Sequence, residues 1–366
     1  MEIRDPVHGF ISVEWGLEPF LNLPLVQRLR RIRQTAMANL VYPGANHTRF
    51  EHSLGCMHIA GRLARKLKLP PEEVELIEKA ALLHDVGHGP FSHVSEQLLA
   101  QYAPVGGRGK VEEIHEEITI LAIEGDARLS TLLGGRKGNV LELIRGRVRS
   151  TRHDIISGPF DADKLDYLLR DSHFCGVKYG AFDLERIVNT VTPIGEGPEN
   201  YMGINEDGFL AVEQMILAKH HMNLQVYRHR VRLITDAMLV RAIEIAIRDG
   251  QQDLKALYDF RPTKGFIDNY LKWDDEALMR VLRNSQSQKA KEYAERLLDR
   301  RLLKVVYSKY IKDFRDALQR DRVAKLERPG LSKVEQEIAA ALSTSRVMKK
   351  GVPNQTQIRT IRQIQS

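Results

Sequence analysis

Hydrophobic residues recur every three to four positions over much of this chain, which is the period of a helix with one buried face. The pattern predicts helices that start near Leu25, around Arg49 and at Glu72, and further helices over 161–171, from Val212 onward and over the charged run 274–301. Two prolines at 70 and 71 separate the second helix from the third, because proline fits only the first turn of a helix. Helix is therefore the dominant predicted structure.

Strand-like segments are short and few. Residues 2–4 and 10–13 flank the turn Asp5-Pro6-Val7-His8-Gly9 and predict a hairpin. Residues 201–212, with Glu206-Asp207-Gly208 at their centre, predict a second one. The glycine-rich basic segments 106–110 and 134–138 are predicted to be flexible loops. The predicted fold class is mainly α with a few short hairpins.

Length and composition set the scale of the fold. The chain has 366 residues, of which 43% are hydrophobic, enough for one large domain or two modest ones. After Phe260 histidines become fewer and basic residues more frequent, and 346–366 form a basic tail without acids. We therefore predict a first domain over 1–260 and a helical C-terminal region over 261–366.

Charge and cysteine content narrow the functional classes. The net charge of +7 favours anionic partners, among them nucleotides, nucleic acid and acidic membrane surfaces. Two cysteines, Cys56 and Cys175, provide no disulfide framework. No apolar run reaches the roughly 20 residues that span a bilayer, and residues 1–5 do not resemble a signal peptide. These features predict a soluble cytoplasmic protein without membrane contact.

The most informative segment is Leu83-His84-Asp85-Val86-Gly87-His88-Gly89-Pro90-Phe91-Ser92-His93. Its adjacent imidazole and carboxylate follow an apolar helical run, where burying such groups as mere packing is unfavourable. Both can bind one metal ion, and His52 and Asp163 are candidates for further ligands. Alone, His52 is also compatible with a structural histidine, and Asp163 with a solvated or helix-capping residue.

These residues resemble the H…HD…D pattern of the HD-domain phosphohydrolases. The segments Asp5–Gly9, Gln27-Arg28-Leu29-Arg30, Phe50-Glu51-His52-Ser53, His84–His93 and Asp163-Lys164-Leu165-Asp166-Tyr167 resemble the deoxynucleoside triphosphate (dNTP) triphosphohydrolase branch. The resemblance covers about 1–260 and implies an HD-domain helical bundle with a few short β-hairpins and a helical C-terminal region.

The resemblance implies a metal site and a reaction. One divalent ion (Mn, Mg, Fe, Zn or Ni) is bound by His52, His84, Asp85 and Asp163, and water attacks the α-phosphorus, which releases a deoxynucleoside and inorganic triphosphate. His115 is implied as the catalytic histidine, with Glu116 as its orienting carboxylate; His88 and His93 are implied near the α-phosphate, and Glu96 supports them. From the residues alone, His115 could equally be a salt-linked surface histidine, and His88 a cap for backbone carbonyls.

The implied dNTP-binding residues are Gln34, Arg49, Lys164, Tyr167, Asp171, Lys219, Tyr227 and His229. Gln34 and Asp171 are matched to the sugar 3′-hydroxyl, Tyr167 to the deoxyribose and the cations to the phosphates. Two positions depart from the vertebrate pattern: Asn223 replaces a histidine and Lys219 an arginine. Solvated cations and a core tyrosine remain the alternative interpretations.

Gln27 and Arg30 match residues that bind an activating nucleotide between subunits, and Asn22 stands where that pattern has an aspartate. The resemblance therefore also implies a homo-oligomer, a dimer or a tetramer. The segment that contains Gln27 and Arg30 is also compatible with the polar face of an amphipathic helix. Two other functions stay open: another HD-type phosphohydrolase or phosphodiesterase, and a regulatory protein that binds nucleotides or nucleic acid. His88 stands where the phosphodiesterases carry a lysine, which favours the triphosphohydrolase.

Overall fold

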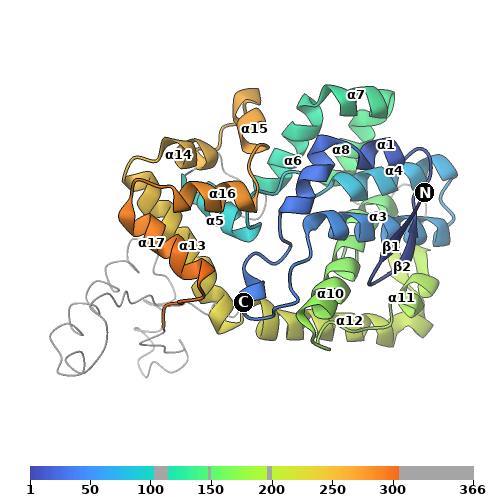
Figure 1. Cartoon of the computed structure of the whole chain (residues 1–366). Helices are drawn as coiled ribbons and strands as arrows, with labels where there is room; N and C mark the ends of the chain where they lie inside the picture. Colours follow the sequence, from blue (N-terminus) through green and yellow to red (C-terminus); the bar gives the residue numbers. More distant parts are fainter. Residues whose placement is uncertain (103–113, 147–149, 196–199, 305–366) are drawn as a thin grey trace, which may run out of the picture. The chain divides into compact units, whose positions relative to one another are not determined.

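The computed structural model describes residues 1–102, 114–146, 150–195 and 200–304. Helices dominate these residues and the strands form two small hairpins, which confirms the predicted fold class (Figure 1). The chain divides into a compact unit Met1–Glu295 and a second unit Arg296–Ser366. The description that follows concerns the first unit. The boundary near Phe260 stays a prediction, and the basic tail lies outside the described residues.

The N-terminal hairpin forms as predicted. Strands β1 (Glu2–Asp5) and β2 (Gly9–Ser12) pair antiparallel, with Glu2 opposite Ser12. The Asp5 carboxylate accepts the backbone N–H groups of Val7 and His8, each at 2.9 Å, and so closes the turn. Gly9 has φ +77°, which glycine adopts without strain.

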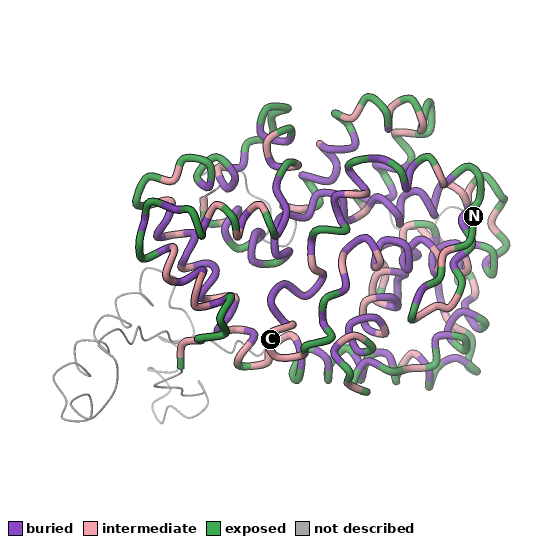
Figure 2. Tube along the Cα trace, viewed as in Figure 1, coloured by how far each residue is buried: buried purple, intermediate pink, exposed green. Residues whose placement is uncertain are grey.

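Three long helices form the centre of the unit. α3 (Arg49–Lys66) packs against α4 (Pro71–Leu83) on one side and α10 (Ala162–Cys175) on another (Figure 1). Thr48 and Glu51 form a capping box at the start of α3, and Asp161 caps α10 by accepting the N–H of Lys164 at 2.7 Å. Burial is nearly continuous along α3 (Figure 2). All three helices were predicted.

Shorter elements surround this centre. Those before α10 are α1 (Glu18–Leu21), α2 (Pro24–Gln27), η1 (Arg28–Arg31), η2 (Ala38–Leu40), α5 (His93–Tyr102), α6 (Ile114–Gly125), α7 (Ala127–Leu133), η4 (Gly134–Arg136), α8 (Lys137–Arg145) and α9 (Thr151–Ser157). The expected loop over 134–138 is wrong: it is the turn η4 and the start of α8, where Lys137 bonds to Glu124 O at 2.7 Å. The other predicted loop, 106–110, lies outside the described residues.

The second predicted hairpin is wrong in its pairing. After α11 (Leu184–Thr190), strand β3 (Val191–Ile194) pairs with β4 (Tyr201–Ile204). The turn η6 (Glu206–Gly208) leads into helix α12 (Phe209–Met222) instead of a returning strand. The reason is the helical spacing of the buried residues Ala211, Met215, Ala218 and Met222.

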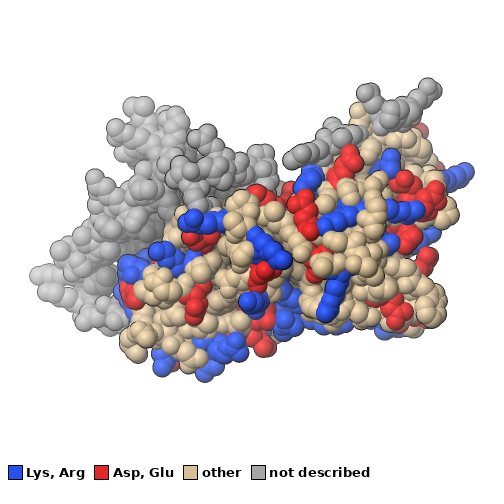
Figure 3. All heavy atoms as spheres, turned by 90° about the horizontal axis from the view of Figure 1, so that it is seen from above, with Lys and Arg blue, Asp and Glu red and all other residues tan. Residues whose placement is uncertain are grey.

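The C-terminal helices of this unit follow a π-turn, η7 (Asn223–Tyr227). They are α13 (Arg230–Arg248), α14 (Gln252–Tyr258), α15 (Lys264–Tyr270), α16 (Asp275–Arg283) and the start of α17 (Gln288–Leu298), which continues past Glu295. The charged run is thus largely helical, as predicted, but it forms two helices. In the described ranges no helix combines the length and hydrophobicity that crossing a membrane requires. On the face shown in Figure 3, acidic and basic side chains of the described residues are interspersed.

Candidate metal centre and active-site cavity

A cavity of about 500 Å³ opens beside α3 and α10. Most of the residues predicted for metal, catalysis and substrate line it: Gln34, Arg49, His84, Asp85, His88, His93, His115, Glu116, Asp163, Lys164, Tyr167, Asp171 and Tyr227. The structure therefore brings together groups that are separated by up to nearly two hundred positions in the sequence.

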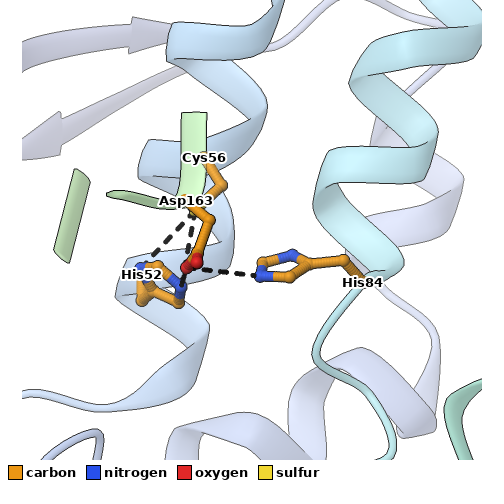
Figure 4. A group of neighbouring side chains, drawn as sticks. All are labelled: His52, Cys56, His84 and Asp163. Atoms are coloured by element: carbon orange, nitrogen blue, oxygen red, sulfur yellow. Dashed lines mark hydrogen bonds and ion pairs between the residues drawn. The ribbon is translucent and has the colours of Figure 1, made fainter. Parts of the chain in front are cut away.

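Four predicted ligands converge at one end of this cavity. His52 from α3 and His84 from the end of α4 face Asp163 of α10 from two sides (Figure 4). Asp163 Oδ1 lies 3.0 Å from His52 Nε2 and 3.8 Å from His84 Nε2. Asp85 is the fourth member of the group. Its Oδ1 lies 3.2 Å from His84 Nε2, and its Oδ2 lies 3.6 Å from His52 Nε2. Two imidazoles and two carboxylates thus surround one point.

The hydrogen bonds around this group fit a metal ion. His84 Nδ1 lies 2.7 Å from Ala81 O, and His52 Nδ1 lies 2.8 Å from Asp166 Oδ2. Acceptors on both Nδ1 atoms leave the two Nε2 atoms as free ligand atoms. Within the described ranges, His84 Nε2 is buried without a hydrogen-bond partner, an arrangement that a bound cation would satisfy.

Both carboxylates are ionised at neutral pH. Burial raises the pKa of Asp163, but contacts with His52 and His84 outweigh burial and hold it well below its usual range. Burial likewise opposes ionisation of Asp85, and Arg49 and His84 more than compensate, so its pKa is also lowered. The Asp85 carboxylate is further paired with the Arg49 guanidinium. A hard divalent cation matches this donor set.

Cys56 is a neighbour of this group that the sequence did not suggest as a ligand. Its Sγ lies 3.5 Å from both ring nitrogens of His52. Burial raises the pKa of the thiol, so it is protonated at neutral pH. Its Sγ lies within 4.8 Å of ligand atoms of His52, His84 and Asp163, so Cys56 is a possible further metal ligand.

A second group of histidines gathers around Glu96 in α5. The Nδ1 atoms of His93, His88 and His115 lie 2.9, 3.1 and 3.2 Å from its carboxylate oxygens. The rings of His88 and His115 stack with centroids 4.1 Å apart. Burial raises the pKa of Glu96, but the three imidazoles outweigh it and keep the carboxylate ionised. Glu116 lines the same cavity, and its role as the orienting carboxylate of His115 stays a prediction.

Burial lowers the pKa of His88 to about 4, with Arg49 and His115 adding to the effect. His88 is therefore neutral at pH 7. Its Nε2 lies 3.3 Å from Asp85 Oδ1, so this imidazole connects the Glu96 group to the metal-ligand group. The structure thereby favours the active-site interpretation of His88 over a capping role.

A turn with left-handed backbone precedes His93. Phe91 and Ser92 have φ values of 55° and 50°, which are unfavourable for residues with side chains. Asp275 accepts the N–H of Phe91 at 2.7 Å, and Ser92 Oγ accepts from Arg49 Nε at 2.7 Å. The region after Phe260 therefore supports the geometry of the cavity.

The predicted substrate residues form the remaining wall. The Asp171 carboxylate accepts from Tyr227 OH at 2.6 Å and contacts His47 Nε2 at 2.6 Å. Tyr167 meets Tyr227 edge to face, with ring centroids 6.2 Å apart. Gln34 Oε1 is buried without a hydrogen-bond partner in the described part of the chain. Lys164 Nζ donates to Gly158 O at 3.0 Å and pairs with Asp161.

Two predicted phosphate or base residues do not reach the cavity. Lys219 is exposed on α12, and His229 turns its ring to the N-terminus of α13, where Nδ1 accepts the N–H of Val231 at 3.2 Å. Arg232, which was not predicted, lines the cavity. Its guanidinium donates to Tyr227 O and lies 3.6 Å from Asp236 Oδ2.

The three residues predicted for an activating nucleotide lie close together on α1, α2 and η1, apart from the cavity lining. Arg30 Nε donates to Gln27 Oε1 at 2.8 Å, and Gln27 Nε2 donates to Leu21 O at 2.7 Å. Asn22 is exposed at the end of α1. Nucleotide binding at this surface stays a prediction.

Sequence reasoning missed the support of the metal ligands. Asp166 and Arg170, four positions apart on α10, are fully buried and pair with each other at 2.8 Å. Asp166 stood inside a recognised motif but had no assigned role. The sequence did contain a signal for this pair, because two charged residues share a helix face with apolar positions. Burying charged side chains in this way is unfavourable unless they are paired.

Two family models match most of the chain. Residues 49–171 match a family model described as HD domain, and 182–350 match one described as HD associated region. The chain is 36% identical over 301 residues to the uncharacterized protein MJ1154 of Methanocaldococcus jannaschii, which is 82% of this chain and 58% of that protein. It is 28% identical over 341 residues to deoxynucleoside triphosphate triphosphohydrolase SAMHD1 of Gallus gallus, which is 82% of this chain and 55% of that protein.

A crystal structure of a phosphohydrolase from Bacteroides thetaiotaomicron superposes with a TM-score of 0.72 at 27% identity, over 94% of this chain and 84% of that one. The chain spans only between half and two thirds of the length of the two curated relatives.

Proposed function

The chain belongs to the HD-domain family, and on this basis we propose that it is a metal-dependent dNTP triphosphohydrolase. The observation that carries the proposal is one cavity that combines a metal-ligand group, an imidazole group and phosphate-binding cations. In the proposed reaction a water oxygen bonds to the α-phosphorus, the bond from phosphorus to the 5′-oxygen breaks, and deoxynucleoside and inorganic triphosphate leave.

His52, His84, Asp85 and Asp163 would hold one divalent ion. When bound, such an ion polarises a phosphoryl oxygen and lowers the pKa of a coordinated water. The chain's own contribution is orientation, because Ala81 O and Asp166 fix the Nδ1 side of the two imidazoles.

The leaving 5′-oxygen needs a proton, and the Glu96 group is placed to supply it. His115 is half-buried, lines the cavity and has its Nδ1 atom against the ionised Glu96 carboxylate. That contact, 3.2 Å from Nδ1 to Glu96 Oε1, holds the imidazole in position beside the cavity. We assign the general acid to His115, and the stacked, neutral His88 to the α-phosphate side.

Three cations line the cavity and would bind the triphosphate. Arg49 lies beside the metal-ligand group, Lys164 follows Asp163 on α10, and Arg232 comes from α13. Guanidinium groups bind phosphate oxygens in a bidentate way. Arg232 takes the place that the resemblance gave to Lys219, because Lys219 is exposed on α12.

The sugar would lie against Tyr167, which lines the cavity four residues from Asp171 on the same helix face. Gln34 and Asp171 offer polar groups for the 3′-hydroxyl, and the unpartnered Gln34 Oε1 is an acceptor for it. A ring close under C2′ would exclude ribonucleotides by steric conflict. A dimer or tetramer with an activating nucleotide at Asn22, Gln27 and Arg30 belongs to the same proposal.

The test is a product assay with purified protein, Mn²⁺, Mg²⁺ or Fe²⁺, and each of the four dNTPs, singly and in mixtures. The expected products are inorganic triphosphate and the deoxynucleoside. Pyrophosphate or monophosphate would indicate attack at another phosphorus and hence a different HD-type phosphohydrolase. Metal and nucleotide binding without turnover would indicate a regulatory protein.

A further inference from the structure

Asp166 is a buried carboxylate whose two oxygens each have two contacts. Oδ1 lies 2.6 Å from His8 Nε2 and accepts from Arg170 at 2.9 Å. Oδ2 lies 2.8 Å from His52 Nδ1 and accepts from Arg170 Nε at 2.8 Å. The carboxylate therefore joins a metal-ligand imidazole to the N-terminal hairpin.

The hairpin is tied to the same network through its turn. Asp5 accepts the N–H of His8 at 2.9 Å and Arg170 NH1 at 2.9 Å. Arg170 thus bridges the carboxylates of Asp5 and Asp166, and it is fully buried. These contacts fix where the His8 ring can lie, because the residue is held by its backbone as well as by its side chain.

A glycine in α3 leaves room for this network. Gly55 lies one turn after His52, and a Cβ atom at this position would come 1.8 Å from Asp166 Oδ1 and 2.6 Å from an Arg170 nitrogen. No larger residue fits without displacing the carboxylate that contacts His52. The absence of a side chain at Gly55 therefore leaves room for the Asp166 carboxylate that contacts both His8 and His52.

We propose that His8 and Asp166 are positioning residues of the metal centre, an inference that rests on the metal site of the proposed function. Asp166 holds the proton of His52 on Nδ1, so that Nε2 keeps its lone pair for the ion. His8 and Arg170 hold Asp166 in the orientation that this requires. Carboxylates that accept from a metal-bound imidazole change metal affinity by about 10- to 100-fold when they are lost.

The experiment measures Mn²⁺ affinity of the full-length, metal-stripped chain by titration calorimetry and follows bound Mn²⁺ by electron paramagnetic resonance. His8→Leu should weaken Mn²⁺ binding by about tenfold. His8→Gln should retain most of the affinity, because its amide N–H reaches the position of Nε2. The matched control is Phe10→Leu, since Phe10 is 57% exposed on the same hairpin. It should bind Mn²⁺ as the wild type does.

Equal affinity in His8→Leu and wild type would overturn the inference, and so would an equal loss in Phe10→Leu. If His8→Leu does not fold by circular dichroism, His8→Asn replaces it, because the shorter amide cannot reach Asp166. A wild type without Mn²⁺ binding overturns the metal site and this inference together. If Mn²⁺ binds but no dNTP is hydrolysed, only the proposed function fails, and the comparison of affinities still decides the role of His8.

Discussion

The two histidine groups of the cavity differ in which ring nitrogens face their central carboxylate. In the metal-ligand group, the Nδ1 atoms of His52 and His84 face acceptors outside the group, and their Nε2 atoms face Asp163. In the Glu96 group, three Nδ1 atoms face a single carboxylate. The first arrangement gathers lone pairs around a point, whereas the second supplies negative charge to imidazoles that can carry protons.

This difference distinguishes the expected roles of the two groups, which residue type alone does not. Both groups consist of histidines and acids, and a second possible set of metal ligands, Asp85, His88 and His115, takes residues from both. What separates them is which nitrogen faces the central carboxylate: Nε2 faces Asp163, whereas Nδ1 faces Glu96. A nitrogen that binds a metal ion cannot hold a proton at the same time. Substitutions in the two groups should therefore fail in different ways.

The largest effect is expected at the centre of the metal-ligand group. Asp163→Ala removes the carboxylate between the two imidazoles, so bound metal and turnover should both fall to background while the fold is kept. Metal analysis and the dNTP assay measure this, with the exposed Asp253→Ala as the control. Retained turnover in Asp163→Ala would remove this residue from the site.

Substitutions in the Glu96 group should lower turnover without loss of bound metal. Glu96→Gln replaces the shared carboxylate by an amide, and kcat should fall by about 10²-fold because the general acid is no longer supported. Glu116→Gln is the matched comparison, since it tests the carboxylate that the sequence favoured for the same role. If Glu116→Gln lowers kcat as much as Glu96→Gln, both carboxylates serve His115; a loss of metal in Glu96→Gln would contradict the division between the groups.

A third contrast concerns the phosphate side of the cavity. Arg232→Gln should lower kcat/KM for dNTPs by about tenfold or more, mostly through KM, because a guanidinium contact to phosphate is removed. Lys219→Gln should leave both constants close to wild type, because this lysine is exposed. The reverse ranking would show that α12 moves toward the substrate when it binds.

The smallest effect concerns a histidine outside both groups. Burial lowers the pKa of His58 to about 4, with His8, Arg62 and Arg65 adding to the effect. The unfolded chain takes up this proton near pH 6.5 and the folded chain only near pH 4, so His58 destabilises the fold as the pH falls between these values. Stability should drop by on the order of 1 kcal/mol from pH 7 to pH 5. His58→Gln should flatten this slope in denaturant unfolding curves of metal-free protein; an unchanged slope assigns it to other groups.

Much of the fold follows from local patterns in the sequence. The starts of α3, α4 and α10 are marked by capping residues and prolines, and their buried faces repeat with the helical period. The second hairpin was placed wrongly because alternation identifies a strand but not its partner. β4 pairs with the preceding β3, and this depends on tertiary packing.

The sequence predicts those site residues whose chemical type alone indicates a function. It does not predict residues whose role depends on contacts in the folded structure. The four predicted ligands are recognisable because histidines and acids are unfavourable in apolar surroundings unless they are paired or bind a metal ion. The role of Asp166 depends on contacts with residues more than one hundred positions away, which no local pattern contains. Motif position pointed to Lys219 and did not mark Arg232, because the two residues lie on separate helices, α12 and α13, and only the fold shows which of them lines the cavity.

The turn at Phe91 and Ser92 has a consequence for how inherited or engineered variants will behave. Its left-handed backbone persists only while Asp275 and Arg49 hold it, and Asp275 contributes nothing to the cavity surface. A change at Asp275 would let the turn relax, and His93 would follow it. Substitution of Asp275 would thus displace a cavity-lining histidine from outside the cavity, so this position should tolerate few substitutions.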